Sequence, residues 1–269
     1  LKYLWGQRRL QENNMLLDGF ELFDSHLHII DKIFPLVPNN GFTPEEFTHK
    51  DYLKQVSNYQ LIGGAIVSGS FQAFDQSYLI AALKSLGPSF VGVTQLPASV
   101  ADEEIMNLNE LGVRALRFNL KRGGSEAIRY LSSMATRIHD LAGWHVELYV
   151  DSYELDSLFT ALIRLPAVSI DHLGLSKSGF KQIVTLAEKG VKIKATGFGR
   201  VDFNVTKTLK DLYAANPESL MFGTDLPSTR SPSPYKHSDF LLVLEALGQE
   251  AAQNVFSKNA INFYRPRMS

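Results

Sequence analysis

The sequence predicts an α/β protein that folds as a single (β/α)8 barrel. Its 269 residues are close to the ~250 residues of a typical barrel of this kind. Short apolar runs rich in β-branched residues alternate with longer segments of helical periodicity, which is typical of parallel βαβ units. Eight such units follow one another without a linker rich in proline, glycine or serine, and this favours one closed barrel. An open, doubly wound sheet is the alternative, which the missing G-x-G-x-x-G motif after the first strand weakens.

Each expected strand is a short run rich in apolar and β-branched residues. In chain order the strands cover residues 20–28, 61–68, 90–96, 113–119, 145–150, 168–172, 191–196 and 220–224. Helical spacing of apolar residues predicts helices over residues 44–58, 76–86, 102–111, 125–142, 153–165, 177–189, 205–216 and 238–247, and a closing helix over 250–264. Gly112, Gly143 and Gly190 follow three of these helices, as expected where a helix ends in a left-handed residue.

Composition argues against several functional classes. Twenty-seven Lys and Arg residues against 28 Asp and Glu leave a net charge of −1, so no bulk charge favours a nucleic-acid or membrane partner. Cysteine is absent, which excludes disulfides, thiolate metal sites and a cysteine nucleophile. No apolar run approaches the 18 residues that a membrane-spanning helix needs. We interpret residues 1–19 as an N-terminal extension without an export signal and residues 20–269 as a barrel domain, and we expect a cytoplasmic protein.

Histidines and aspartates stand at the carboxyl ends of three predicted strands, where barrels of this kind carry their functional sites. His26 and His28 end the first strand, and period-two geometry places them with Asp24 on one face. His172 ends the sixth strand and Asp225 ends the eighth. Imidazole and carboxylate can bind a divalent ion such as zinc, and they are equally suited to acid–base chemistry at neutral pH. We therefore expect the four side chains to form one site.

A second group of strand-end residues is basic or hydroxylic. Guanidinium groups bind carboxylates bidentately, so arginines at one rim of an otherwise neutral protein predict a small anionic substrate. Tyr149 on the fifth strand and Ser70 after the second add possible hydrogen-bonding groups. The arginines at this rim are Arg117, Arg122, Arg200 and, with less support, Arg230.

Six motifs occur in order along the chain: D-S-H-x-H-I at 24–29, V-R-A-L-R-F-N at 113–119, W-H-V-E-L-Y at 144–149, I-D-H-L-G at 170–174, G-F-G-R at 197–200 and F-G-T-D-L-P at 222–227. Together they resemble the amidohydrolase superfamily, and more closely its 2-pyrone-4,6-dicarboxylate lactonase group. The resemblance extends from about residue 20 to residue 264. It implies a barrel of the amidohydrolase type that hydrolyses the C–O bond of a lactone.

The resemblance also implies roles for single residues. Asp225 matches the base that activates water, and the imidazoles around the substrate carbonyl match His26, His28 and His172. Many amidohydrolases bind a divalent metal through the H-x-H pair and the strand-eight aspartate, here His26, His28 and Asp225, whereas the pyrone lactonases need none. The substrate-binding positions match Arg117, Arg122, Tyr149, Arg200 and Ser70.

One position departs from the family pattern. Leu175 stands where the family has an arginine, three residues after the strand-six histidine. The missing cation favours a mono-anionic or smaller lactone over a pyrone dicarboxylate. We expect a hydrolase that opens a lactone of a carboxylated small molecule by Asp-activated water. A metal-dependent decarboxylase or amide hydrolase on the same barrel is one alternative, and a silent binding protein is another.

Overall fold

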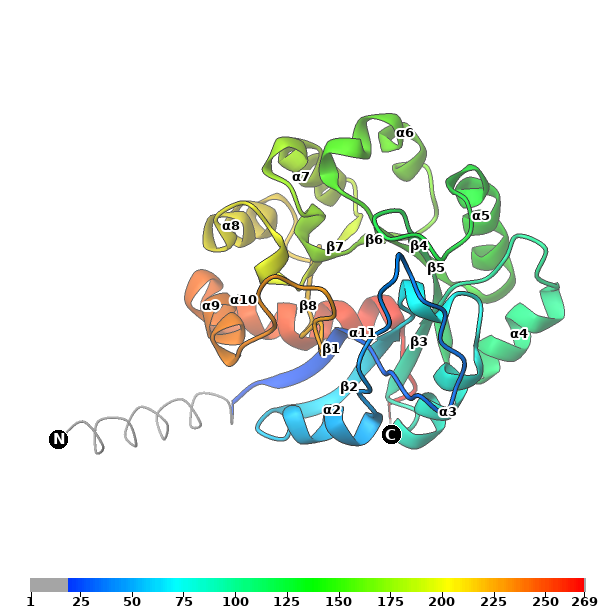
Figure 1. Cartoon of the computed structure of the whole chain (residues 1–269). Coiled ribbons are helices and arrows are strands. Elements are labelled where there is room, and N and C mark those ends of the chain that lie inside the picture. Colours follow the sequence, from blue (N-terminus) through cyan, green and yellow to red (C-terminus); the bar gives the residue numbers. More distant parts are fainter. Residues whose placement is uncertain (1–18, 269) are drawn as a thin grey trace.

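The computed structural model describes residues 19–268 and contains one sheet of eight parallel strands, whose order follows the chain. The strands are β1 (Glu21–Leu27), β2 (Gln60–Val67), β3 (Phe90–Thr94), β4 (Val113–Asn119), β5 (His145–Tyr149), β6 (Val168–Ile170), β7 (Lys192–Ala195) and β8 (Leu220–Phe222). β8 returns beside β1, so that the sheet forms a nearly closed barrel (Figure 1). The predicted (β/α)8 barrel is confirmed, and the open doubly wound alternative is wrong.

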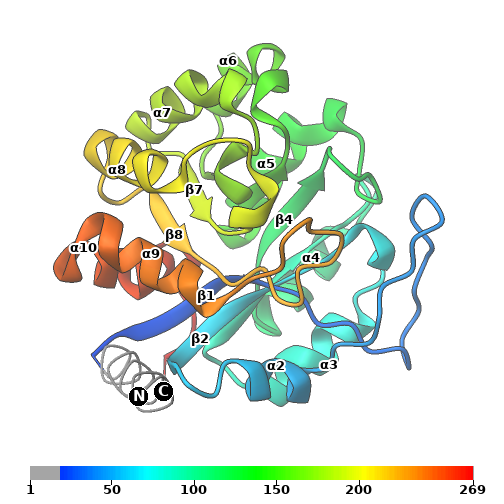
Figure 2. The same cartoon turned by 60° about the vertical axis from the view of Figure 1, so that its left-hand side comes forward.

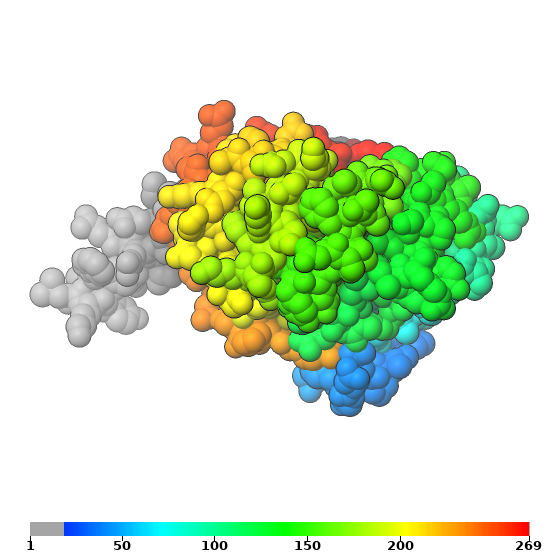
Figure 3. All heavy atoms as spheres, turned by 90° about the horizontal axis from the view of Figure 1, so that it is seen from above, coloured from blue at the N-terminus to red at the C-terminus, as the bar shows by residue number. Residues whose placement is uncertain are grey.

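Helices connect the strands and surround the barrel (Figures 1 and 2). Figure 3 shows the green-to-yellow part of the chain forming one continuous surface on the face seen from above. The expected closing helix consists of α10 (Gln249–Gln253), a π-helical turn (Asn254–Lys258) and α11 (Asn259–Tyr264). The other helices are α2 (His49–Gln55), α3 (Ser77–Leu86), α4 (Asp102–Glu110), α5 (Leu131–Ala142), α6 (Phe159–Leu162), α7 (Phe180–Glu188), α8 (Val205–Ala215) and α9 (His237–Leu247).

Several helical segments differ from the prediction. α5 begins at residue 131 rather than 125, after a 3₁₀ turn (Ile128–Tyr130), and α7 begins at residue 180 rather than 177. α2 begins at residue 49 rather than 44, because the Thr48 side chain accepts a hydrogen bond from the Asp51 backbone and so caps the helix there. The segment predicted as a helix over 153–165 contains a 3₁₀ segment (Ser152–Ser157) and the four-residue α6. Residues 1–18 of the expected N-terminal extension lie outside the described residues. Within the described range, no helix is long and apolar enough to cross a membrane.

Apolar side chains pack in two layers, one on each side of the sheet. Inside the barrel, small residues of β2 and β3 pack against Phe23, Met221 and Tyr264. A larger layer, which includes Leu22 and Leu27, separates the strands from the helices. Burying a side chain of this size contributes about 1.5–3 kcal/mol, so both layers stabilise the strands. Polar side chains inside such a barrel are exceptions that need a specific partner.

Side-chain alternation fails within β1, which corrects the expectation that Asp24 shares a face with the two histidines of this strand. Strict alternation would place Phe23 and Leu27 on one face, yet Phe23 lies inside the barrel and Leu27 lies in the helical layer. The register of β1 against β2 shifts between Asp24 and Leu27. Such an irregularity redirects the side chains that follow it, and here His26 and His28 face the interior whereas Asp24 does not.

Asp24 instead connects the two strands that close the barrel. Its buried carboxylate accepts hydrogen bonds from the backbone N of Thr224 at 2.8 Å and from the Thr224 hydroxyl at 2.6 Å. The Tyr52 hydroxyl of α2 donates a third at 3.0 Å. Burial raises the pKa of Asp24 to about 6 despite these donors. Asp24 is therefore a structural residue of the seam between β1 and β8.

Backbone hydrogen bonds continue this seam beyond the strand ends. The N–H of Asp225 donates to the His26 carbonyl at 2.7 Å, and the N–H of His28 donates to the Leu226 carbonyl at 2.8 Å. The chains approach so closely that a Cβ atom at Gly223 would lie 2.6 Å from the backbone N of His26. Closure of the barrel thus brings Asp225 directly beside His26 of β1 and His28, the first residue after this strand.

We predict that Gly223→Ala destabilises the protein, because the added methyl group would push the two strands of the seam apart. Overpacking of this kind costs about 1–3 kcal/mol, which urea denaturation would measure. Gly19→Ala is the control, since a Cβ atom at Gly19 meets nothing within 4 Å. Equal stability of the two variants would contradict the tight seam.

Candidate active site

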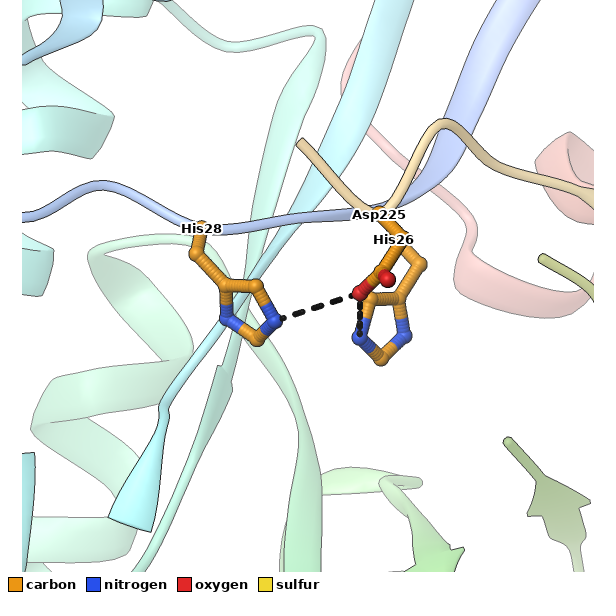
Figure 4. Close-up of side chains that lie close together, drawn as sticks. All are labelled: His26, His28 and Asp225. Atoms are coloured by element: carbon orange, nitrogen blue, oxygen red, sulfur yellow. Dashed lines mark ion pairs between the residues drawn. The ribbon is translucent and has the colours of Figure 1, made fainter. Parts of the chain in front are cut away.

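Three imidazoles surround one carboxylate oxygen where β1, β6 and β8 end. The Nε2 atoms of His28, His26 and His172 lie 3.7, 3.8 and 4.0 Å from Oδ1 of Asp225. Figure 4 shows His26 and His28 turned toward this carboxylate. All four side chains are buried. The structure therefore brings together the four residues for which the sequence predicts one site.

In His28 and His172, the ring nitrogen that faces away from Asp225 lies beside a hydrogen-bonding partner. Nδ1 of His28 donates to the Val67 carbonyl at 2.7 Å, which leaves its Nε2 free to face Asp225. Nδ1 of His172 lies 2.7 Å from the Thr196 hydroxyl. Burial lowers the pKa of His26 to about 4 and that of His172 well below its usual value. These two rings are therefore neutral at pH 7, and each carries a single proton.

The surroundings of Asp225 favour the ionised form of its carboxyl group. Burial opposes its ionisation, but the charge of Arg200 and the neighbouring imidazoles outweigh burial and lower the pKa of Asp225 well below its usual value. The Nε of Arg200 donates to Oδ2 at 2.8 Å, while Oδ1 has no hydrogen-bond partner among the described residues. Asp225 also has a φ of 58°, a left-handed conformation that concentrates at functional sites.

A cavity lies over this cluster. His26 lies beneath the cavity floor, with a nitrogen that has no hydrogen-bond partner among the described residues. The other eight residues expected at the site all line the cavity, namely His28, Ser70, Arg117, Arg122, Tyr149, His172, Arg200 and Asp225.

Arg117 lines the cavity but its guanidinium already has protein partners. It donates to Oδ2 of Asp171 through Nη2 at 2.7 Å and through Nε at 3.3 Å, and to the Ser68 carbonyl at 2.7 Å. Arg200 is likewise paired, with Asp225 and with the Thr229 carbonyl at 3.0 Å. The structure thus places both arginines where predicted, but each compensates a buried carboxylate.

Two further arginines at the mouth have no acidic partner among the described residues. Arg230 donates to the neutral side chains of Asn39 at 2.9 Å and Ser70 at 2.8 Å, and lies over the ring of Phe42. Asn39 and Phe42 belong to the loop after β1, which stands out from the barrel in Figure 2. Arg122 contacts this loop only through its backbone carbonyl, which accepts from Asn39. Their positive charges are available to a bound anion.

A second hollow adjoins the cavity on its outer side. Tyr149 lines both spaces, and its ring packs edge-on against His172 with a centroid distance of 5.0 Å. Leu175 lines only the outer hollow, together with the shared arginines. The residue at the position that departs from the family pattern therefore lies beside the mouth, as one buried apolar side chain in a hollow lined mostly by charged and polar residues.

Comparison with known proteins assigns the chain to a family. A family model for amidohydrolases matches residues 23–265. The chain belongs to the amidohydrolase family. Within it, a 2-pyrone-4,6-dicarboxylate hydrolase of Comamonas testosteroni is 28% identical over 156 residues, which are 56% of this chain and 51% of that protein. The chain thus spans about half the length of the curated relative that it matches.

Solved amidohydrolase structures share the fold over most of the chain. A Pseudomonas putida protein, named among the 2-pyrone-4,6-dicarboxylic acid hydrolases, is 26% identical with a TM-score of 0.76 and covers 91% of this chain and 97% of its own. An Acinetobacter baumannii protein of the same name is 18% identical with a TM-score of 0.78, over 91% and 99% of the two chains. At 18% identity that likeness shows the fold alone. The resemblance indicated by the motifs is confirmed.

The donor set of this amidohydrolase fits a divalent metal ion. Ligand atoms that share a zinc ion at about 2.0–2.2 Å lie roughly 3–4 Å apart, as Asp225 Oδ1 does from the Nε2 atoms of His26 and His28. Two of these three atoms are buried without a hydrogen-bond partner among the described residues. An ion held by these three residues would act as a Lewis acid and lower the pKa of bound water.

A polar network inside the barrel of this amidohydrolase was not predicted from the sequence. Lys194 of β7 is fully buried and donates to Glu147 of β5, which also accepts from Tyr264 of α11 and lies 3.0 Å from His145. Burial alone would raise the pKa of Glu147, but the charge of Lys194 outweighs it and lowers that pKa to about 2. A lysine in the middle of a strand expected to be buried is the signal that could have revealed it.

We predict that Asp171→Asn strongly destabilises the protein. Asp171 is buried and neutralises the equally buried Arg117, so its loss leaves an uncompensated charge that costs about 3–5 kcal/mol. Asp211→Asn removes the exposed Lys207 pair on α8 and should cost less than about 1 kcal/mol. Urea denaturation measures both, and similar losses in the two variants would refute the importance of the buried pair.

Proposed function

We propose that this protein hydrolyses a lactone of a carboxylated small molecule. The observation that carries the proposal is an ionised carboxylate oxygen within 4.0 Å of three imidazole nitrogens, at the floor of a cavity. Two arginines at the mouth of this cavity have no acidic partner among the described residues. The names of the Comamonas testosteroni and Pseudomonas putida relatives support the same reaction, since a pyrone dicarboxylate is a carboxylated lactone.

Asp225 would act as the general base. Its Oδ1 accepts a proton from water while the water oxygen forms a bond to the lactone carbonyl carbon, and the electron pair of the C=O bond moves to the carbonyl oxygen. The C=O bond then re-forms from the electron pair on the carbonyl oxygen as the C–O bond to the ring oxygen breaks, and protonated Asp225 returns its proton to that leaving oxygen. The product is an open-chain acid. Arg200 supports this role because it keeps Asp225 ionised and occupies only Oδ2.

Imidazole N–H groups would stabilise the negative charge on the carbonyl oxygen. His172 can donate from Nε2 because its Nδ1 can accept from the Thr196 hydroxyl, whereas a neutral His28 cannot, because the Val67 carbonyl holds its proton on Nδ1. Preorganised donors in a site shielded from water are effective for this purpose. Removing one such donor typically costs about 2.7–4 kcal/mol of transition-state stabilisation. A zinc ion held by His26, His28 and Asp225 would supply the same stabilisation in the alternative reading, a metal-dependent amide hydrolase or decarboxylase, which the fit of the donor set supports.

The charges at the mouth support an anionic substrate. Arg117 and Arg200 are compensated by Asp171 and Asp225, whereas Arg122 and Arg230 have no acidic partner among the described residues. Leu175 carries no charge at the position where the family has an arginine, which favours a substrate with a single carboxylate near the mouth over a dicarboxylate. We therefore infer a mono-anionic lactone as the preferred substrate.

We predict that Asp225→Asn lowers kcat by at least 10²–10⁴-fold, because an amide cannot accept the proton from water. Steady-state hydrolysis of a panel of carboxylated lactones measures the loss, and circular dichroism checks the fold. Asp140→Asn on α5 is the control and should retain full activity. Turnover by Asp225→Asn at the wild-type rate would rule out Asp225 as the base.

We predict that Arg122→Met raises KM for carboxylated lactones by roughly ten- to a hundredfold. This is the loss of affinity expected when one hydrogen bond to a charged group is removed. Neutral lactones of the same ring size should keep their KM. Arg129→Met, which removes an exposed cation in the following turn, should change neither value. An equal rise for charged and neutral lactones would show that Arg122 does not bind the carboxylate.

A further inference from the structure

The loop that follows β1 reaches the mouth of the cavity as a tight hairpin over residues 39–42. Asn39 and Phe42 exchange two backbone hydrogen bonds, of 2.9 and 3.1 Å. Between them, Asn40 and Gly41 have φ values of 51° and 75°. Positive φ at both central residues is what the tightest hairpin turns require, and asparagine followed by glycine adopts it most readily. The turn therefore holds the side chains at its two ends in defined positions.

Asn39 contacts both segments that carry the free cations of the mouth. Its Oδ1 accepts from Nη1 of Arg230 at 2.9 Å, and its Nδ2 donates to the backbone carbonyl of Arg122 at 3.0 Å. A guanidinium group only donates and a carbonyl only accepts, so these two partners fix the orientation of the amide. Arg122 follows β4 and Arg230 follows β8. One side chain of the hairpin thus connects the loops of two other strands.

Arg230 is held by neutral groups. Besides Asn39, the Ser70 hydroxyl accepts from its Nη2 at 2.8 Å, and its guanidinium lies 4.5 Å from the centre of the Phe42 ring. None of these three partners carries a negative charge, so they position the guanidinium without compensating it. A guanidinium has five N–H donors, and these two hydrogen bonds leave donors for a ligand.

Two like charges therefore lie close together at the mouth. Burial and the nearby charge of Arg122 lower the pKa of Arg230. A carboxylate bound beside both arginines would relieve their repulsion, and charge-assisted hydrogen bonds to it would be stronger than those to neutral groups. An acidic residue in place of Asn39 would remove this advantage, because it would pair with Arg230 before any ligand arrives.

We propose that Asn39 is a positioning residue that holds Arg230 beside Arg122 and, because it is neutral, leaves the positive charge of Arg230 to the carboxylate of the substrate. The hairpin over residues 39–42 thereby determines the preference of the cavity for anions. The identity of the substrate as a lactone rests on the proposed function, but the binding of an anion does not.

Binding of benzoate and benzamide tests this role, because the two molecules share a ring and differ in charge. Calorimetry at low salt measures both affinities without any hydrolysis. We expect wild type to bind benzoate roughly tenfold or more tightly than benzamide. Asn39→Asp places a carboxylate against Arg230, so it should weaken benzoate binding by roughly ten- to a hundredfold and leave benzamide binding unchanged.

Two further variants separate charge from position. Asn39→Ala removes both hydrogen bonds and adds no charge, so it should weaken benzoate binding only by roughly two- to tenfold. Asn40→Asp is the matched control, since it adds the same charge at the exposed neighbouring residue and aspartate tolerates a left-handed backbone. It should change benzoate binding by no more than about twofold.

Equal affinity of wild type for the two probes would overturn the proposal, and so would equal losses of benzoate binding in Asn39→Asp and Asn40→Asp. A parallel loss of benzamide binding in Asn39→Asp would show that Asn39 only supports the hairpin. If Asn39→Asp does not fold, unchanged benzoate binding by Asn39→Ala refutes the role. The expected benzoate pattern in a protein that hydrolyses no lactone would refute the proposed function but not the role of Asn39.

Discussion

Closure of β8 against β1 determines the geometry of the site. The two strands meet through backbone hydrogen bonds from Asp225 to His26 and from His28 to Leu226, and Asp24 connects the same strands through its side chain. The bonds align the ends of the two strands, so the carboxylate and two imidazoles cannot separate without opening the barrel. A single structural event, the return of the last strand to the first, therefore completes both the fold and the candidate site.

Charge compensation explains which cations remain available to a ligand. Inside the barrel, Glu147 balances Lys194, and at the cavity wall Asp171 balances Arg117. These buried pairs hold the histidines in place and leave no net charge beneath the site. At the mouth, Arg122 and Arg230 lack such partners among the described residues, and they lie where an incoming anion would arrive. The buried ion pairs thus position the imidazoles, whereas the two arginines at the mouth favour an anionic ligand.

Much of this arrangement could be predicted from the sequence. The eight strands, the meeting of His26, His28, His172 and Asp225, and the cavity-lining arginines follow from periodicity and from the strand ends. Asp24 could not be placed correctly, because a register shift within β1 breaks the alternation on which such reasoning depends.

The ion-pair partners of Arg117 and Lys194 also could not be predicted from the sequence. They lie on other strands, at separations of 54 and 47 residues, so only the closed barrel shows which charges are already compensated. Periodicity indicates the face on which a side chain lies but not the atom that it contacts across the barrel.

The most direct test of the account is a crystal structure of Asp225→Asn soaked with a carboxylated lactone. The account predicts that the lactone carbonyl oxygen lies within hydrogen-bonding distance of an imidazole Nε2, with the carboxylate beside Arg122 and Arg230. A lactone bound in another cavity, or one held with its carboxylate toward the histidines and its carbonyl in solvent, would contradict it.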